Sequence, residues 1–394
     1  MSHTAPGPIA SQFVQTWTEF ATLADGWDAL LAESTVGCTF LTWDWVSSWA
    51  AVYGRDAEPF VHLCRDERGA VIGIVPLIRL RTTLASNFVR IVRFVGDIGD
   101  NSDNLDLIAR SGREADTVSS VLSALESSPK MWDVLDLRRI SAESPALPHL
   151  LEGVRQRGWI VTEISEPHLV LDLPSTWEAF LKRLSSNTRW RLSRNASLLA
   201  AEGALAYRVC ETSGDIATYL DALFALQAQR WALRGQRPGR DEQVRRLFYD
   251  RLTPRLLYHH RLEFDMLELD GRPIAAQLGV HYGDTYYALH TGFDPSFARF
   301  SPSVALAGEI VRRLTARGIR HYDYLHGDEP YKLRWLPRKT TFARLVIVRP
   351  GSLGARYVSL ADVAAVWRAR VRDRFPSVWA RLRSARNHFR GGGA

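Results

Sequence analysis

Residues 321–335 read HYDYLHGDEPYKLRW, and this stretch decides how the second half of the chain is interpreted. A strand-like segment with Asp323 runs into a loop that carries His326 and two carboxylates, followed by Tyr331 and Lys332. Lysine is rare here, since the chain has only four, at positions 130, 182, 332 and 339. A base, a hydroxyl and a cation after a strand end are typical of an active-site loop, whereas a lysine beside exposed acids is ordinarily a surface ion pair.

The segments around this stretch predict alternating helices and strands. Helices are expected at 216–234, 241–252 and 301–319, with a hairpin at 262–282 and strands at 284–295 and 340–348. In the helix at 301–319, apolar residues recur at helical spacing, and Gly318 lies where the helix should end.

The same order of elements occurs in the first half. A second hairpin is expected at 59–80, after a tryptophan-bearing helix at 42–54 and before an aspartate-bearing strand at 133–139. The repeat indicates an internal duplication of an α/β unit.

Length and composition favour a two-domain globular protein. The 394 residues exceed the usual size of one core, and 46% of them are hydrophobic. No apolar run reaches the length of a membrane span and the first residues do not read as a signal peptide, so a cytoplasmic location is expected. Cys38, Cys64 and Cys210 are far apart without a CxxC motif, which favours buried structural thiols and no metal site.

The excess of basic residues is confined to one end of the chain. From Val366 onward there are eight arginines and one aspartate, which accounts for the whole formal charge of +7. A basic body, and with it DNA binding, is therefore not expected. Residues 361–389 instead predict two short basic amphipathic helices.

The motif order resembles a known enzyme family. GFDPSFARFSP (292–302), a helix, and then DYLHGDEPYKLRW (323–335) are similar to GNAT-type acyltransferases of the cellulose-biosynthesis CelD type, relatives of the Fem aminoacyltransferases with two GNAT units in tandem. The resemblance covers about residues 12–350. It implies an α/β (α+β) fold of two GNAT-like units, each a mixed central sheet flanked by helices, at 1–174 and 175–350, with a basic helical tail at 351–394.

The resemblance implies transfer of an acyl group from acyl-CoA to an amine or hydroxyl of a small molecule or saccharide. In GNAT enzymes a glycine-rich loop before a helix holds the coenzyme A pyrophosphate, but the corresponding stretch here, 295–304, has no glycine. Arg299, Ser301 and Ser303 are the candidate donor-binding residues at this helix start. Ser301 and Pro302 also fit a plain helix cap.

The resemblance implies four catalytic candidates: Lys332, Tyr331, His326 and Asp323. Lys332 would face a phosphate or an acyl carbonyl, and Tyr331 would protonate the departing thiolate. His326, Asp328 and Glu329 are the possible bases. Trp231, Arg230 and His290 are the candidates for acceptor binding. The first half, which lacks a lysine loop, is expected to shape the acceptor cleft.

Two other functions remain open. One is a Fem-like transferase that uses aminoacyl-tRNA, and the other is a non-catalytic scaffold with the same fold. The basic tail would contact the body of the protein or a second subunit, an anionic membrane surface, or a polyanion such as tRNA. A role in envelope or exopolysaccharide biosynthesis, at the inner face of the membrane, follows from the resemblance alone.

Overall fold

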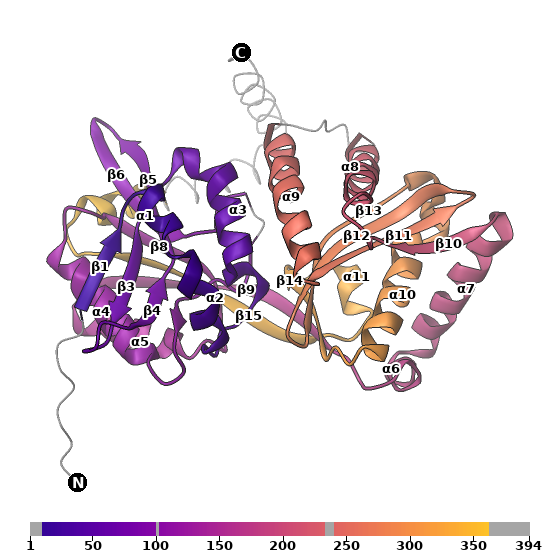
Figure 1. Ribbon diagram of the computed structural model, residues 1–394, viewed down its shortest axis with the longest axis horizontal. Helices are drawn as coiled ribbons and strands as arrows, with labels where there is room; N and C mark the ends of the chain where they lie inside the picture. Colours follow the sequence, from indigo (N-terminus) through magenta and orange to yellow (C-terminus); the bar gives the residue numbers. More distant parts are fainter. Residues whose placement is uncertain (1–9, 100–101, 233–239, 362–394) are drawn as a thin grey trace, which may run out of the picture.

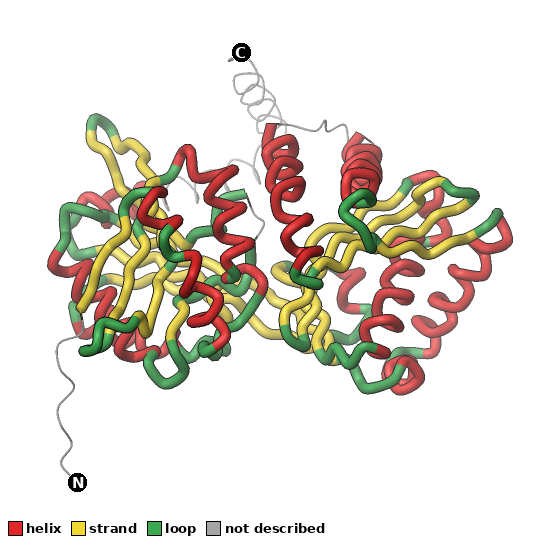
Figure 2. Tube along the Cα trace, in the orientation of Figure 1, coloured by secondary structure: helices red, strands yellow, loops and turns green. Residues whose placement is uncertain are grey.

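The computed structural model describes residues 10–99, 102–232 and 240–361, which form the mixed α/β fold predicted from the sequence (Figures 1 and 2). Apart from its first residue, the basic segment predicted at 361–389 lies outside these ranges. No helix within the described ranges is long and apolar enough to cross a membrane. The three cysteines are buried free thiols, as expected.

One long sheet runs through both halves of the protein. Among the described residues it has eleven strands, which follow one another in the order β10 (Leu205–Val209), β11 (Leu262–Leu269), β12 (Arg272–Tyr282), β13 (Thr285–Phe293), β14 (His321–His326), β9 (Ile160–Asp172), β15 (Arg338–Val348), β8 (Val134–Ser141), β6 (Asn87–Phe94), β5 (Leu77–Leu84) and β2 (Glu58–Pro59). Only the β13–β14 and β6–β8 pairs within it are parallel.

The middle of the sheet joins the two halves. β15 pairs with β8 on one side and along its whole length with β9 on the other, while the end of β9 also pairs with β14. Phe342, Leu345 and Ile347 of β15 are fully buried. The boundary predicted at residues 174 and 175 stays a prediction, but the strand that ends the expected second unit completes the sheet of the first.

The first half also has a small antiparallel sheet. Its strands are β1 (Ala10–Val14), β3 (Val61–Arg65), β4 (Val71–Val75) and β7 (Ile108–Ala109). The helices of this half are α1 (Trp17–Ala21), α2 (Ala24–Ala32), η1 (Thr39–Leu41), α3 (Trp43–Tyr53), η2 (Gly54–Asp56), α4 (Glu114–Ser127) and α5 (Ala146–Gln156). Both predicted hairpins are present, β3–β4 and β11–β12, but they belong to different sheets.

Helices cover both faces of the sheet in the second half. They are α6 (Trp177–Arg183), α7 (Ser186–Glu202), α8 (Ile216–Ala232), α9 (Arg240–Tyr258), η3 (Pro295–Phe300), α10 (Pro302–Ala316) and α11 (Pro330–Leu333). α8 and α9 lie on one face, whereas α7 and α10 lie on the other (Figure 1). The α9 helix also packs on α3, where the rings of Phe248 and Trp45 meet edge to face.

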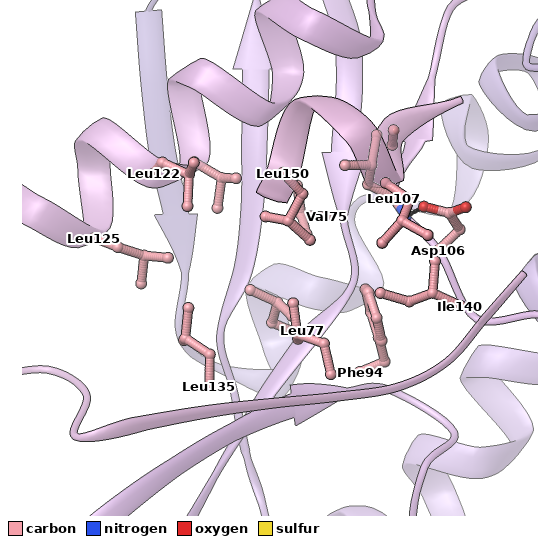
Figure 3. A pocket seen from close by; sticks show the side chains of 14 residues that line it. Val75, Leu77, Phe94, Asp106, Leu107, Leu122, Leu125, Leu135, Ile140 and Leu150 are labelled. Carbon is pink, nitrogen blue, oxygen red and sulfur yellow. Dashed lines mark hydrogen bonds between the residues drawn. The ribbon is translucent and has the colours of Figure 1, made fainter. Parts of the chain in front are cut away.

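A small apolar pocket lies in the core of the first half. Leucines of α4 and α5 face Val75, Leu77 and Phe94, with the Asp106 carboxyl at one edge (Figure 3). Burial raises the pKa of Asp106 to about 7. The pocket has a volume of about 30 Å³, room for little more than a water molecule, so it is a packing defect rather than a ligand site.

Replacing Phe342 by Ala is expected to destabilise the protein strongly. Its fully buried ring stacks on the His168 ring of β9, with centroids 4.0 Å apart, so the change leaves a cavity in the middle of the shared sheet. We expect the free energy of unfolding in urea to fall by about 3–5 kcal/mol. Thr341→Ala, at the exposed neighbouring position, should cost about 0.5 kcal/mol or less. Equal losses in the two variants would contradict the central place assigned to β15.

Candidate functional site

A cleft opens where two parallel strands separate. β13 and β14 pair only from Thr285 to Tyr287 and from His321 to Asp323. Beyond that point β13 continues along β12, whereas β14 bulges away and rejoins β9 at His168. The cleft has a volume of about 670 Å³, which is in the range of small-molecule sites.

The bulge in β14 is held by Asp323. Leu325 adopts a left-handed backbone with φ 63°, a conformation that costs energy for a non-glycine residue. The Asp323 carboxylate accepts a hydrogen bond of 2.7 Å from the Leu325 N–H, and it also binds His168 Nε2 at 2.8 Å and Asn104 Nδ2 at 3.2 Å. Asp323 is 3% exposed and is not among the residues that line the cleft, so its contacts are those of a structural carboxylate.

His326, at the end of the bulge, lines the cleft and is held by a residue of the first half. Its backbone N–H donates to Asp103 Oδ2 at 3.1 Å, and its ring Nδ1 lies 2.9 Å from the same oxygen. Burial would raise the pKa of Asp103, but the hydrogen bond from His326 and the charge of Arg139 hold it below its ordinary value. An ionised Asp103 can only accept a hydrogen bond, so a neutral His326 must carry its proton on Nδ1. The lone pair of the ring is then on Nε2.

The segment that carries Asp103 is itself fixed by several contacts. The Trp45 indole donates to Ser102 Oγ at 2.8 Å, and the Leu105 N–H donates to the Arg139 carbonyl at 3.0 Å. Asp103 was not predicted from the sequence, because nothing local connects it with a loop more than two hundred residues away. The signal in the sequence was a glycine- and aspartate-rich segment, GDIGDNSDNLD, at 96–106.

Lys332 is buried behind the loop that follows β14. Its ammonium donates to the His326 carbonyl at 2.9 Å and lies 2.7 Å from Glu329 Oε2. The neighbouring Tyr331 also lines the cleft, and partial burial together with the charge of Glu329 raises its pKa to about 12. Lys332 therefore fastens the loop to the end of β14, and the Tyr331 hydroxyl is protonated at neutral pH.

The start of α10 forms another wall. Ser301 and Ser303 both line the cleft, and Ser301 has a left-handed φ of 50° at the N-cap position. Ser301 is the N-cap residue and Pro302 follows it at the first helical position, as the helix-cap explanation predicts, but the Ser301 side chain makes no capping hydrogen bond. Arg299 does not line the cleft; its exposed guanidinium lies 3.3 Å from Glu202.

The candidates for acceptor binding come from α8 and β13. Arg230 and His290 line the cleft, and His290 Nε2 lies 2.8 Å from the Tyr249 hydroxyl. Burial and the nearby Arg245 charge lower the pKa of His290 to about 3, so this histidine is neutral. Trp231 is in the last turn of α8, and its side chain is outside what the structure describes.

The cleft thus brings together residues from distant parts of the sequence. Seven predicted candidates line it: Arg230, His290, Ser301, Ser303, His326, Tyr331 and Lys332. Further polar residues of the lining, not predicted from the sequence, include Asp103, Arg245, Tyr249, Gln277 and Arg334. Within the described ranges, no group of three or more histidine, cysteine or acidic side chains is placed to hold a metal ion.

Stability in acid should depend on Asp103. Its pKa in the folded protein lies below the ordinary value of 3.8, so its contribution is present above that pH and is lost as the pH falls through the folded pKa. We expect Asp103→Asn to melt at a lower temperature at pH 7 and to lose less of its stability between pH 5 and about 3 than the wild type does. Melting temperatures across this range test the prediction, with Asp25→Asn as an exposed control. Parallel acid profiles for wild type and Asp103→Asn would contradict it.

Residues 186–333, which contain most of the cleft, match the protein family described as acetyltransferase (GNAT) domain. The chain is similar over its length to the crystal structure of FemX, with a TM-score of 0.57, 11% identity, and coverage of 85% of this chain and 96% of that one. A conserved protein of unknown function from Bacteroides thetaiotaomicron has a TM-score of 0.54 and 13% identity, covering 83% and 97% of the two chains.

A third similar structure is the C-terminal domain of a putative lysylphosphatidylglycerol synthetase from Agrobacterium fabrum. Its TM-score is 0.50 at 13% identity, and the match covers 88% of this chain and 96% of that one. No curated protein matches the chain. The comparisons support a GNAT domain in the second half and a Fem-like fold across both halves, while the CelD-type branch stays a prediction.

Proposed function

We propose that this protein is a GNAT-type acyltransferase that moves an acyl group from acyl-CoA to an amine or hydroxyl of a small molecule or saccharide. The observation that carries the proposal is the hydrogen-bonded pair of His326 and Asp103 at the wall of the cleft between β13 and β14. A histidine whose other ring nitrogen is held by a carboxylate is equipped to accept a proton in the neutral pH range.

The donor would be held at the start of α10. Helix N-termini favour phosphate groups because their backbone N–H groups and the helix dipole carry partial positive charge. Ser303 and the uncommitted hydroxyl of Ser301 add hydrogen-bond donors at the same wall, which offsets the missing glycine-rich loop. Bound there, the donor would supply a thioester carbonyl for attack by the acceptor.

His326 is the proposed general base. Its Nε2 accepts the proton that the acceptor amine or hydroxyl loses when it attacks, and the Asp103 carboxylate stabilises the imidazolium that forms. The Tyr331 hydroxyl, protonated because its pKa is about 12, donates a proton to the departing thiolate. Lys332 and Asp323 are positioning residues in this scheme, since they fix the loop and the strand end that carry His326.

A second candidate is a Fem-like transferase that takes its acyl group from aminoacyl-tRNA. The similarity to FemX across both halves favours it. The neutral charge of residues 1–365 weighs against it, because tRNA binding ordinarily uses a broad basic surface. Contact with an anionic membrane surface through 361–389, and a role in envelope or exopolysaccharide assembly, also remain proposals.

Activity should depend on His326 in a way that pH reveals. With acyl-CoA as donor, His326→Ala is expected to lower kcat by about 10²–10⁴ and to remove the acid limb of the pH–rate profile. Asp103→Asn should lower kcat and alter the same limb, because it disturbs the orientation of the ring. His321→Ala, at the other end of β14, is the matched control and should keep the wild-type profile.

Donor binding is tested separately from catalysis. A donor present at 100 times its dissociation constant should stabilise the fold by about 2.7 kcal/mol, and His326→Ala should retain this shift. If coenzyme A and acyl-CoAs of different chain length all fail to raise the melting temperature, the acyl-CoA form of the proposal is wrong. A rise in melting temperature with charged tRNA would then favour the Fem-like function. No rise with any donor would favour a scaffold.

A further inference from the structure

The cleft is lined by more cationic side chains than carboxylates. Four cationic side chains line it, Arg230, Arg245, Lys332 and Arg334, against two carboxylates, Asp103 and Glu329. Both carboxylates are already engaged by cations or imidazole within the protein. Asp103 pairs with Arg139 and His326, and Glu329 pairs with Lys332.

Arg230 and Arg334 carry the part of this charge that no described carboxylate balances. Among the described residues, neither Arg230 nor Arg334 forms an ion pair with a carboxylate. The Arg230 guanidinium lies over the Phe293 ring, 5.8 Å from its centroid, and both residues line the cleft. A cation on an aromatic wall of a cleft is well placed to receive an anion from solution.

Arg230 and Arg245 come from two helices that pack on each other, α8 and α9, and both line the cleft. Arg245 of α9 donates to Gln227 Oε1 of α8 at 3.4 Å, and Gln227 lies one helical turn before Arg230. The charge of Arg245 helps to lower the pKa of His290 inside the cleft. His290 is therefore neutral and takes no part in balancing an anion.

The helices of these two arginines are separate from the start of α10. α8 and α9 cover one face of the sheet and α10 covers the other (Figure 1), yet residues of α8, α9 and α10 all line the cleft. The cleft thus passes through the gap between β13 and β14. A donor held at α10 and an acceptor that enters along α8 and α9 would meet at this gap, beside His326.

We propose that the acceptor carries an anionic group, a carboxylate or a phosphate, which Arg230 and Arg245 bind while its amine or hydroxyl faces His326. The identification of the bound molecule as the acceptor rests on the proposed function, whereas the anion site itself does not. Guanidinium groups bind both kinds of oxyanion through paired N–H donors. Arg334, at the end of α11, also lines the cleft and adds a positive charge.

The test is a calorimetric titration of the full chain with inorganic phosphate and with acetate, in the presence of saturating coenzyme A so that the start of α10 is occupied. We expect binding to the wild type that is at least tenfold weaker in Arg230→Gln/Arg245→Gln. Arg320→Gln, at an exposed position before β14, is the matched control and should bind as the wild type does. Melting temperature and near-UV circular dichroism check that each variant is folded.

Three results would overturn the proposal. In the first, the wild type binds neither anion. In the second, the double variant binds the anions as tightly as the wild type does. In the third, the double variant loses affinity for coenzyme A, which would assign the arginines to the donor. Failure of the proposed function has a different signature, since the wild type would not bind coenzyme A. The anions are then titrated alone, and the comparison of wild type with the double variant still decides the anion site.

A kinetic comparison distinguishes the source of the anion. With acetyl-CoA as donor, phosphoethanolamine should be preferred to ethanolamine, or glycine to glycinamide, by at least tenfold in kcat/KM. Arg230→Gln/Arg245→Gln should abolish that preference through KM. A preference that survives in the double variant, or that favours the uncharged partners, would contradict binding of the acceptor's anionic group by these arginines.

Discussion

The bend at the end of β14 is the feature on which the cleft depends. Two carboxylates hold it: Asp323 accepts the Leu325 N–H from within the strand, and Asp103 accepts the His326 N–H from the first half of the chain. Together they stabilise a left-handed residue that a regular strand would not contain. The pairing of β14 with β13 ends at Asp323, where the bend begins, and the cleft lies beyond that point.

The same contacts explain why buried charge is tolerated here. Burying a carboxylate without partners is costly, and both Asp103 and Asp323 lie almost entirely out of solvent. Each is surrounded by N–H donors from several segments, so the strand end, the 102–105 segment and β9 are fixed relative to one another. The position of the His326 ring is thus set by both halves of the protein.

The sequence predicted the elements of the second half well, because helical spacing, hairpin turns and strand alternation are local patterns. It also placed His326, Tyr331, Lys332, Ser301 and Ser303 near one another, since they lie in adjacent segments around a strand and a helix. Asp103 was missed because its partnership with His326 is tertiary. The contacts of Lys332 were also beyond prediction, because a buried lysine that donates to a backbone carbonyl and a surface lysine have the same local sequence.

The placement of β15 has a consequence for how the chain is made. β8 and β9 of the first half emerge from the ribosome long before β15, the strand that lies between them in the finished sheet. Until then each of them presents an open edge of unpaired backbone groups, which is a surface prone to pairing with other chains. The first half therefore remains incomplete while the second half is synthesised, so this is the interval in which a chaperone would matter most to this protein.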